Sequence, residues 1–215
     1  MIVTWMGHAC FLFKPQQGPT VLTDPYEVGG SINYAPIRVA PDIVVVSHDH
    51  FDHNKVSAVP GTPEVVKGDG NKAAKGVEFR GIGAYHDAAG GAERGTNTIF
   101  CFALDGLRLC HLGDLGHELS GREGEEIGAV DILLVPVGGN FTIDAAQAER
   151  VCRQLGPKVV LPMHYKTPRI DFPIAGVEDF VRGKTNVRQV EGSDVEFLPQ
   201  SLPTATEIVV LNPAT

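Results

Sequence analysis

The feature that most constrains this chain is a cluster of histidines directly after a predicted strand. Residues 42–47 form a β-branched run without polar alternation, which is typical of a strand buried on both faces. The next six residues, 48–53, read His-Asp-His-Phe-Asp-His. Imidazole and carboxylate groups at this spacing can supply ligands to two neighbouring divalent ions. The alternative, a solvated polar loop, is disfavoured because chance rarely places three histidines and an aspartate in these positions.

Two ions need more ligands than one loop provides, and the chain carries further donors at other predicted strand ends. His86, Asp114 and His164 each follow an apolar strand. One edge of the sheets could therefore gather all of the donors at a single site. Each of the three alone is a weak signal, because a single histidine at a strand end is more often an ordinary hydrogen-bonded residue. Together with residues 48–53, they predict a site for two metal ions.

Glycine and proline divide the chain into short segments, with 25 Gly and 15 Pro in 215 residues. This pattern favours many short strands joined by tight loops. Helices are expected over residues 142–155, where Asp144 and Gln147 resemble a capping box, and over residues 177–182. Strands are expected over residues 2–5, 10–13, 20–23, 42–47, 64–67, 77–85, 98–104, 107–112, 131–137, 158–162, 195–198 and 207–211. The mixture predicts an α/β fold of two sheets with helices outside.

Composition disfavours several other classes of protein. Lys and Arg total 18 against 26 Asp and Glu, and this formal charge of −8 argues against a broad basic face for nucleic acid or anionic membrane. Cys10, Cys101, Cys110 and Cys152 are scattered through apolar stretches, so buried free thiols are expected. No apolar run is long enough to span a bilayer, and the first residues do not resemble a secretory signal. A cytoplasmic location is therefore expected.

The chain resembles the metallo-β-lactamase fold superfamily. The ordered signature of that family is an aspartate after an early strand, His-x-His-x-Asp-His, a histidine, an aspartate and a final histidine. It is matched in this order by Asp24, residues 48–53, His86, Asp114 and His164. Residues 4–9, 136–142 and 162–165 are similar to the branch that contains L-ascorbate-6-phosphate lactonase and many uncharacterised metal-dependent hydrolases. The resemblance covers residues from about 2 to 170. It implies a four-layer αββα sandwich, here one domain over residues 1–215, with the metal site at one edge of the two sheets.

The resemblance also implies roles for the individual donors. Three histidines are expected around the first metal: His48, His50 and His86. Three further donors are expected around the second: Asp52, His53 and His164. Asp114 would bridge the two ions, and Asp24 would brace the histidine loop, because metal-bound imidazoles need a partner on their other nitrogen. This ligand set lacks a thiolate, so zinc is favoured while manganese and iron remain open.

A mechanism follows from two ions about 3.5–4 Å apart, which would bring the pKa of a bridging water close to neutrality. The resulting hydroxide would attack a carbonyl or phosphoryl centre whose oxygen one metal polarises. Asp52 and Asp114 are the expected catalytic residues, because they are placed to orient the hydroxide and to take its remaining proton.

Three further histidines have both a functional and a structural interpretation. His8 is expected near the metals or the substrate, with a core histidine as the alternative. For His111 a structural role is favoured. His117 could donate a proton to a leaving group or be an exposed loop residue.

Four other residues are candidates for contacts with the substrate. Tyr165 directly follows a ligand, so its hydroxyl could contact the substrate, and packing beside the site is the alternative. Asn140 belongs to a Gly-Gly-Asn segment that could let a substrate approach the backbone or simply form a tight turn. Lys166 and Arg169 are candidates to bind an anionic group such as phosphate, although a solvated basic loop is the default interpretation.

The leading interpretation is a metal-dependent hydrolase of a small ester, lactone or phosphoester, with an anionic substrate left open. A phosphodiesterase or ribonuclease of the same fold is the first alternative, and the acidic charge and the lack of a basic aromatic patch disfavour it. A non-catalytic metal-binding sensor is the second, and the completeness of the ligand set disfavours it. The substrate, the resident metal and a homo-oligomeric state are left open, because a fold does not determine them.

Overall fold

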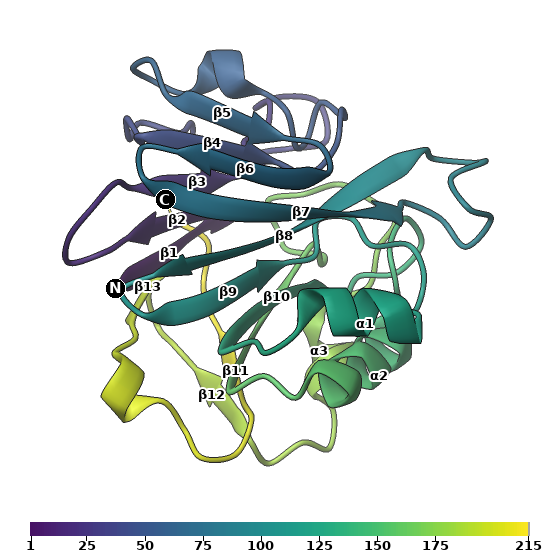
Figure 1. Cartoon of the computed structure of the whole chain (residues 1–215). Helices are drawn as coiled ribbons and strands as arrows, with labels where there is room; N and C mark the ends of the chain where they lie inside the picture. Colours follow the sequence, from purple (N-terminus) through teal and green to yellow (C-terminus); the bar gives the residue numbers. More distant parts are fainter. Residues whose placement is uncertain (215) are drawn as a thin grey trace.

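The computed structural model describes residues 1–214, which form two β-sheets packed face to face (Figure 1). The first sheet has the strand order β13-β1-β2-β3-β4-β5, and the second has the order β12-β14-β11-β10-β9-β8-β7-β6. The strands of the first sheet are β1 (Ile2–Gly7), β2 (Cys10–Lys14), β3 (Val21–Thr23), β4 (Ile43–Val46), β5 (Glu64–Lys67) and β13 (Asp194–Glu196). Those of the second are β6 (Gly70–Ala74), β7 (Val77–Tyr85), β8 (Thr96–Leu104), β9 (Leu107–His111), β10 (Ile132–Pro136), β11 (Val159–Met163), β12 (Val187–Gln189) and β14 (Glu207–Val210).

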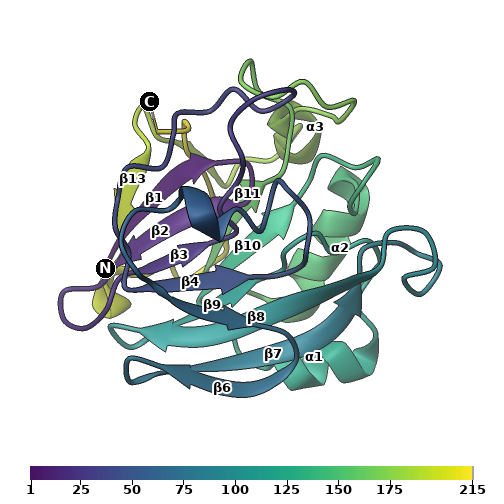
Figure 2. The same cartoon turned by 90° about the horizontal axis from the view of Figure 1, so that it is seen from above.

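The α-helices lie against the second sheet, on the side away from the first (Figures 1 and 2). They are α1 (Gly121–Ile127), α2 (Ala145–Leu155) and α3 (Val177–Val181), and 3₁₀ turns form at Val56–Ala58 and Pro199–Ser201. Helix α2 begins at the expected capping box, because the Asp144 carboxylate accepts from the Gln147 amide at 2.8 Å and the Gln147 side chain accepts from the Asp144 amide at 3.0 Å. Residues 142–144 therefore precede the helix rather than belong to it.

Strand direction brings the functional segments to one edge. Strand β10 is parallel to both β9 and β11. Strands β7 and β9 are each antiparallel to β8, so they run in the same direction as one another. In the first sheet, β4 ends beside this edge, where the carbonyl of Ser47 accepts from the amide of Thr98 at the start of β8. The carboxyl ends of β4, β7, β9, β10 and β11 therefore meet at one place.

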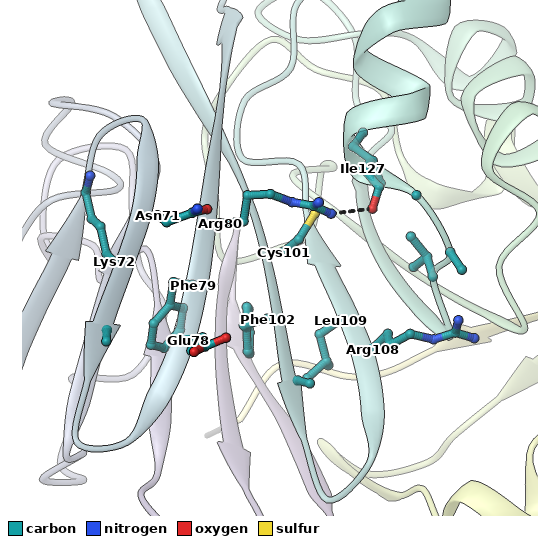
Figure 3. Close-up of a pocket in the computed structure, with 15 residues that line it drawn as sticks. Asn71, Lys72, Glu78, Phe79, Arg80, Cys101, Phe102, Arg108, Leu109 and Ile127 are labelled. Carbon is teal, nitrogen blue, oxygen red and sulfur yellow. Dashed lines mark hydrogen bonds between the residues drawn. The ribbon is translucent and has the colours of Figure 1, made fainter.

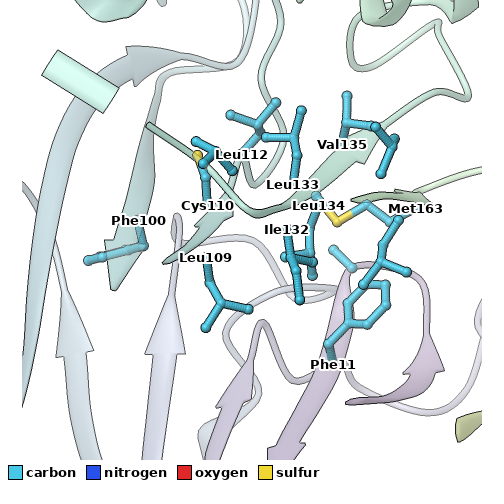
Figure 4. Packing of buried hydrophobic residues seen from close by; sticks show 14 of the residues in the cluster. Phe11, Phe100, Leu109, Cys110, Leu112, Ile132, Leu133, Leu134, Val135 and Met163 are labelled. Carbon is cyan, nitrogen blue, oxygen red and sulfur yellow. The ribbon is translucent and has the colours of Figure 1, made fainter. Parts of the chain in front are cut away.

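The interior is apolar and continuous between the sheets. One cluster combines residues of both, such as Phe11 of β2 with Leu134 of β10 and Met163 of β11 (Figure 4). A second cluster covers the outer face of the first sheet, where Tyr26, Ile32, Tyr34 and Ile37 pack on strand residues. Glycine and proline in residues 26–41 prevent a helix there, so this outer layer is irregular.

The two-sheet α/β sandwich predicted from the sequence is confirmed, and the differences are local. Strands β6 and β12 were not predicted, because Gly70–Ala74 has low β-propensity and Val187–Gln189 is a short, largely polar segment at the end of its sheet. The four cysteines are free thiols, as expected. Among residues 1–214, no helix combines the length and the apolar character needed to cross a bilayer.

Candidate metal centre

The donors predicted from separate strand ends lie together at this edge. Residues 48–53 follow β4, His86 follows β7, Asp114 lies three residues beyond the end of β9, and His164 follows β11. All of the predicted ligands except His50 are buried. The convergence results from the strand directions, since each donor leaves the carboxyl end of its own strand.

Asp114 lies at the centre of the cluster. Its Oδ2 atom is 3.2 Å from each of three imidazole Nε2 atoms, those of His53, His86 and His164. The carboxylate is 1% exposed, and its backbone amide donates to the side-chain oxygen of Asn97 at 2.9 Å. Two ligands of one tetrahedral ion, each bound at about 2.1 Å, lie roughly 3.4 Å apart. The spacing around Asp114 therefore fits donors that share metal ions, and each contact is also within the distance of an ion pair between imidazole and carboxylate.

The donor atoms form overlapping groups in which all atoms lie within 4.8 Å of one another. One group is His48, His50 and His86, and a second is His48, His53 and Asp114. The third is His8, Asp52, His53 and His164. The first group consists of the donors expected at the first metal. The third group contains the donors expected at the second metal, together with His8.

Unpaired polar atoms indicate that these residues fit divalent ions. Nε2 of His53 and Oδ1 of Asp114 are buried without a hydrogen-bond partner, as is Nδ1 of His8, His86, His111 and His164. A buried polar atom without a partner is energetically costly, and a bound cation would remove that cost for two of these atoms, Nε2 of His53 and Oδ1 of Asp114. Asp24, Asp52 and Asp114 have only histidines as salt-bridge partners within the described residues. This concentration of negative charge also favours bound cations.

Asp24 lies beneath the histidine loop and fixes two imidazoles. Its carboxylate accepts from Nδ1 of His53 at 2.9 Å, from Nε2 of His111 at 2.8 Å and from the hydroxyl of Ser47 at 2.7 Å. The Ser47 hydroxyl oxygen in turn accepts from Nδ1 of His48 at 2.9 Å. The ring protons of His48 and His53 are therefore held on Nδ1, which leaves Nε2 of both rings directed toward Asp114.

The buried charges shift the pKa values of these groups. Burial alone would raise the pKa of Asp24, but the His111 and His53 imidazoles hold it well below its ordinary value. Burial and the neighbouring His53 lower the pKa of His48 to about 3. Burial and His164 lower the pKa of His8 to about 4. Asp24 therefore stays ionised, and His8 and His48 stay neutral. Burial alone would lower the pKa of His53, but Asp114 and Asp52 hold it well above its ordinary value. Because a metal ligand must be deprotonated, a cation bound at His53 has to displace this proton.

His8 and His111 lie behind the donor cluster rather than on the pocket wall. Nε2 of His8 donates to Oδ2 of Asp52 at 3.1 Å, and its ring centroid is 4.1 Å from that of His164. His111 donates to Asp24 and is fully buried. Both histidines thus contact a carboxylate of the site from the protein interior.

A cavity of about 320 Å³ opens above the donors. Its wall combines five predicted ligands with three aromatic residues and one cation: His50, Asp52, His86, Asp114, His164, Phe51, Phe141, Phe172 and Arg94. A larger cavity of about 840 Å³ lies on the outer face of β6 to β9, where Arg80 donates to the carbonyl of Ile127 beside Cys101 (Figure 3). No histidine lines that larger cavity, so the smaller one is the candidate site.

Three predicted contacts to the substrate are not found at the pocket. The Tyr165 hydroxyl donates to the carbonyl of Leu211 at 3.4 Å, and its ring packs 5.1 Å from that of Trp5. His117 accepts from the Tyr85 amide through Nε2 and donates to a backbone carbonyl through Nδ1, so both ring nitrogens are bound. Asn140 is exposed in a turn with φ +61°. None of the three lines the cavity.

The predicted basic pair also lies outside the cavity wall. Nζ of Lys166 donates to Asp171 at 3.2 Å and to the carbonyl of Phe172 at 3.1 Å, and Arg169 is an exposed residue of the same loop. The cation that lines the cavity is Arg94. Arg94 could not be predicted from the sequence, because it lies eight residues beyond His86, within a glycine-rich loop.

Two glycines contact the backbone of predicted ligands, and the sequence did not reveal these contacts. Gly138 belongs to the Gly-Gly-Asn segment considered above for substrate approach or a tight turn, and no role was predicted for Gly116. A Cβ on Gly138 would lie 2.2 Å from the carbonyl oxygen of His164, and one on Gly116 would lie 2.2 Å from the backbone of His86 and Asp87. Neither position tolerates a side chain without moving a ligand segment. Their only sequence signal is that each lies a few residues after a buried strand, β9 for Gly116 and β10 for Gly138.

A two-sheet sandwich with clustered imidazole and carboxylate groups at one sheet edge defines the class of metallo-β-lactamase-fold proteins. The sequence profile of the Beta-lactamase superfamily domain matches residues 2–164. The chain therefore belongs to this superfamily, as its motif indicated.

The similar proteins agree with this assignment. The chain is 31% identical over 214 residues to a UPF0173 metal-dependent hydrolase of Methanosphaerula palustris, and the match covers 87% of this chain and 94% of the relative. A Thermotoga maritima protein, assigned as a Zn-dependent hydrolase of the metallo-beta-lactamase superfamily, superimposes with a TM-score of 0.79 at 36% identity over 98% of this chain and 97% of its own. A metallo hydrolase of Ignicoccus hospitalis shares the fold, with a TM-score of 0.61 at 22% identity over 80% and 85% of the two chains.

Proposed function

We propose that this protein is a hydrolase that uses two divalent metal ions to cleave a small ester, lactone or phosphoester. The observation that carries this proposal is the position of Asp114, whose Oδ2 lies 3.2 Å from three imidazole nitrogens at the wall of an open cavity. The names of the relatives, which are metal-dependent hydrolases, support it.

The proposed ligands divide between two positions. His48, His50 and His86 would hold one ion, and Asp52, His53 and His164 the other, with Asp114 between them. Zinc is the favoured metal, and the same oxygen and nitrogen donors also suit manganese or iron. Bound ions of this kind supply a Lewis acid and lower the pKa of a coordinated water, so that hydroxide is available near neutral pH.

The two carboxylates that line the cavity are the proposed proton acceptors. Burial alone would raise the pKa of Asp52, but His53 and the hydrogen bond from His8 hold it well below its ordinary value. Asp52 therefore remains ionised and is held in one orientation by His8. Because Asp52 and Asp114 both face the cavity, either can orient a nucleophilic water and accept its proton.

The size and charge of the cavity support a small substrate. Its volume of about 320 Å³ is close to the lower limit of roughly 300–1,000 Å³ for ligand sites. Arg94 is the one lysine or arginine on its wall, and the chain carries a formal charge of −8. A polyanionic substrate such as RNA needs many more cations, so a small ester or lactone is favoured over a nucleic acid.

The test combines metal analysis with a substrate panel. Purified protein is reconstituted with zinc, manganese or iron, its metal content is measured, and hydrolysis of esters, lactones, phosphomonoesters and phosphodiesters is compared. We expect about two metal ions per chain and turnover of an ester or lactone. Asp114→Asn should lose both metal and turnover, while the control His117→Gln, outside the cavity, should keep both.

Each other outcome has a defined meaning. Much faster cleavage of phosphodiesters than of any lactone would replace this proposal with the phosphodiesterase alternative. Bound metal without hydrolysis of any compound in the panel would favour a metal-binding sensor. Full turnover by metal-depleted protein would contradict the proposal.

A further inference from the structure

Three phenylalanines form the mouth of the cavity above the donors. We call Phe51, Phe141 and Phe172 the aromatic collar. The ring of Phe172 lies 6.4 Å from that of Phe51 and 5.8 Å from that of Phe141, both in edge-to-face geometry. Phe51 is 55% exposed, although it belongs to the metal-binding motif itself. Binding of metal ions does not require exposed aromatic rings. The collar therefore indicates that this part of the cavity also binds an apolar group of a ligand.

One cation stands beside the collar. The guanidinium carbon of Arg94 lies 5.7 Å from the ring centroid of Phe141, within the range of a cation–π contact. The ion-pair partner of Arg94 is Glu93 at 3.3 Å, whose side chain is 64% exposed. Exposed ion pairs contribute little free energy, so Arg94 can exchange Glu93 for an anionic group of a ligand at low cost.

The backbone that carries Arg94 is fixed before any ligand binds. The carboxylate of Asp87 accepts from four amides of the loop, those of Ala89, Gly91, Glu93 and Arg94, at distances of 2.7–3.0 Å. Asp87 itself directly follows the proposed ligand His86. The loop is therefore tied to the metal-binding edge, and little backbone ordering remains to oppose ligand binding.

The collar is likewise connected to the donors. Phe51 lies between His50 and Asp52 in the chain, and the ring of Phe172 packs 5.7 Å from that of His8. The backbone carbonyl of Phe172 accepts from Nζ of Lys166 at 3.1 Å. A ring held in the collar consequently lies next to the donor cluster, where the bond to be cleaved must be placed.

We propose that the substrate is a small ester or lactone that carries an apolar, planar ring and one anionic group. The collar binds the ring through edge-to-face contacts, and Arg94 binds the anionic group by charge-assisted hydrogen bonds. This inference rests on the proposed hydrolase function and specifies its substrate class.

The same wall disfavours a sugar as the substrate. Apart from the donor cluster, the cavity is lined by the three collar residues and Arg94. A polyhydroxylated sugar buried there would lose hydrogen bonds to water without gaining partners from the phenylalanines. The collar therefore separates this chain from a lactonase that acts on sugar phosphates.

The test uses four methyl esters, so that the leaving group is the same and has no ring. Their acyl parts are acetyl, phenylacetyl, hemisuccinyl and 4-carboxyphenylacetyl, which carry in turn neither feature, the ring alone, the charge alone and both. For the metal-loaded wild type, we expect kcat/KM to be highest for the ester with both features. Arg94→Gln should lower kcat/KM by about 10-fold to 100-fold for the two charged esters, the range of one charge-assisted hydrogen bond, and leave the neutral ones unchanged.

The collar is tested by a matched variant. Phe172→Leu keeps an apolar side chain but removes the ring, and it should lower kcat/KM by about 5-fold for the two ring-bearing esters only. Arg122→Gln, on the exposed surface of α1, is the control for Arg94→Gln and should change nothing. Equal kcat/KM for all four esters in the wild type, or no effect of Arg94→Gln, would overturn the inference while leaving the hydrolase proposal intact.

A binding measurement separates the two proposals. Calorimetric titration with 4-carboxyphenylacetate should give a Kd at least about 10-fold lower for the wild type than for Arg94→Gln, and lower than the Kd of succinate. This result would support the ligand class even if none of the four esters is hydrolysed, in which case only the hydrolase proposal fails. Equal affinity of wild type and Arg94→Gln for 4-carboxyphenylacetate would contradict the inference directly.

Discussion

The carboxylate of Asp24 accepts from Nδ1 of His53 at 2.9 Å, and both side chains are completely buried. A carboxylate on the far nitrogen of an imidazole fixes the position of the ring proton and the orientation of the ring. Through Ser47, the same carboxylate also orients His48. Asp24 is therefore a positioning residue for two proposed ligands, although it does not line the cavity itself.

Asp24→Asn should lower the affinity for metal by about 10-fold to 100-fold, the usual effect of removing such a partner. The amide lacks the charge that stabilises the bound state. If its oxygen takes the place of Oδ2, which accepts from both histidines, its NH₂ group lies against the Ser47 amide that donates to Oδ1. Competition with a chromophoric chelator measures the affinity. Asp42→Asn is the control, because Asp42 bonds Thr20 at the other end of β4. Unchanged affinity in Asp24→Asn would show that His53 is oriented by packing alone.

Removal of metal should destabilise the protein. Without cations, the buried Asp24, Asp52 and Asp114 have only imidazoles to balance their charge. A ligand present at 1,000 times its Kd stabilises the folded state by about 4 kcal/mol. For a domain of this size that corresponds to a decrease in Tm of roughly 8–16 °C on chelation. Differential scanning fluorimetry before and after dialysis against EDTA tests this, and zinc should restore the original Tm.

The variant Asp114→Asn shows whether the change in Tm comes from metal bound at this cluster. Its Tm should respond little to EDTA or zinc, whereas His117→Gln should respond like the wild type. A wild-type Tm that is the same with and without metal would argue against metal ions at this cluster.

Gly138→Ala should disturb the site through a single methyl group. Its Cβ would lie 2.2 Å from the carbonyl oxygen of His164, so the backbone of this proposed ligand must move. We expect a loss of about 1–3 kcal/mol in unfolding free energy together with weaker metal binding. Gly121→Ala is the matched control, because nothing lies within 4 Å of a Cβ there, and alanine in a helix is favourable. Equal metal affinity in both variants would show that the edge accommodates the methyl group.

The cluster of donors could be predicted from the sequence because each donor follows a strand that the sequence pattern also predicts. Buried strands such as Ile43–Val46 and Val159–Met163 are continuous apolar runs, and the polar residues after them must lie at a sheet edge. The predicted fold class was confirmed for the same reason. Strand β6 was missed, because Gly70–Ala74 has little β-propensity and forms only by pairing with β7.

The cavity wall could not be anticipated in the same way, because its residues meet only in the folded chain. Phe51, Phe141 and Phe172 come from three separate loops. Lys166 is a candidate anion site from its nearness to His164 in sequence, with a solvated basic loop as the default interpretation, and in the structure it bonds Asp171 in its own loop. The one available signal for Arg94 was Asp87 before a glycine-rich stretch, since aspartate often caps the amides of such a loop.

We expect Asp131, which lies far from the candidate metal centre, to make the free energy of unfolding depend on pH. Arg108 donates to its carboxylate at 2.8 and 2.7 Å, and chiefly for this reason the pKa of Asp131 lies below its ordinary value. A carboxylate with a lowered pKa stabilises the fold above its unfolded-state pKa of about 3.9, and this stabilisation is lost as the pH falls through the folded-state pKa. Because the Arg108 side chain is 55% exposed, solvent screening limits the contribution.

Asp131→Asn should therefore cost about 1 kcal/mol at pH 7, and this cost should shrink as the pH falls below about 4 and through the lowered folded-state pKa of Asp131, below which wild type and variant both carry an uncharged side chain. Urea unfolding across this range measures the difference. Asp179→Asn, at an exposed pair with Arg182 on α3, is the control and should have a smaller effect at every pH. A cost for Asp131→Asn that is the same at pH 7 and at a pH below the folded-state pKa of Asp131 would mean that hydrogen-bond geometry, rather than charge, joins β9 to the start of β10.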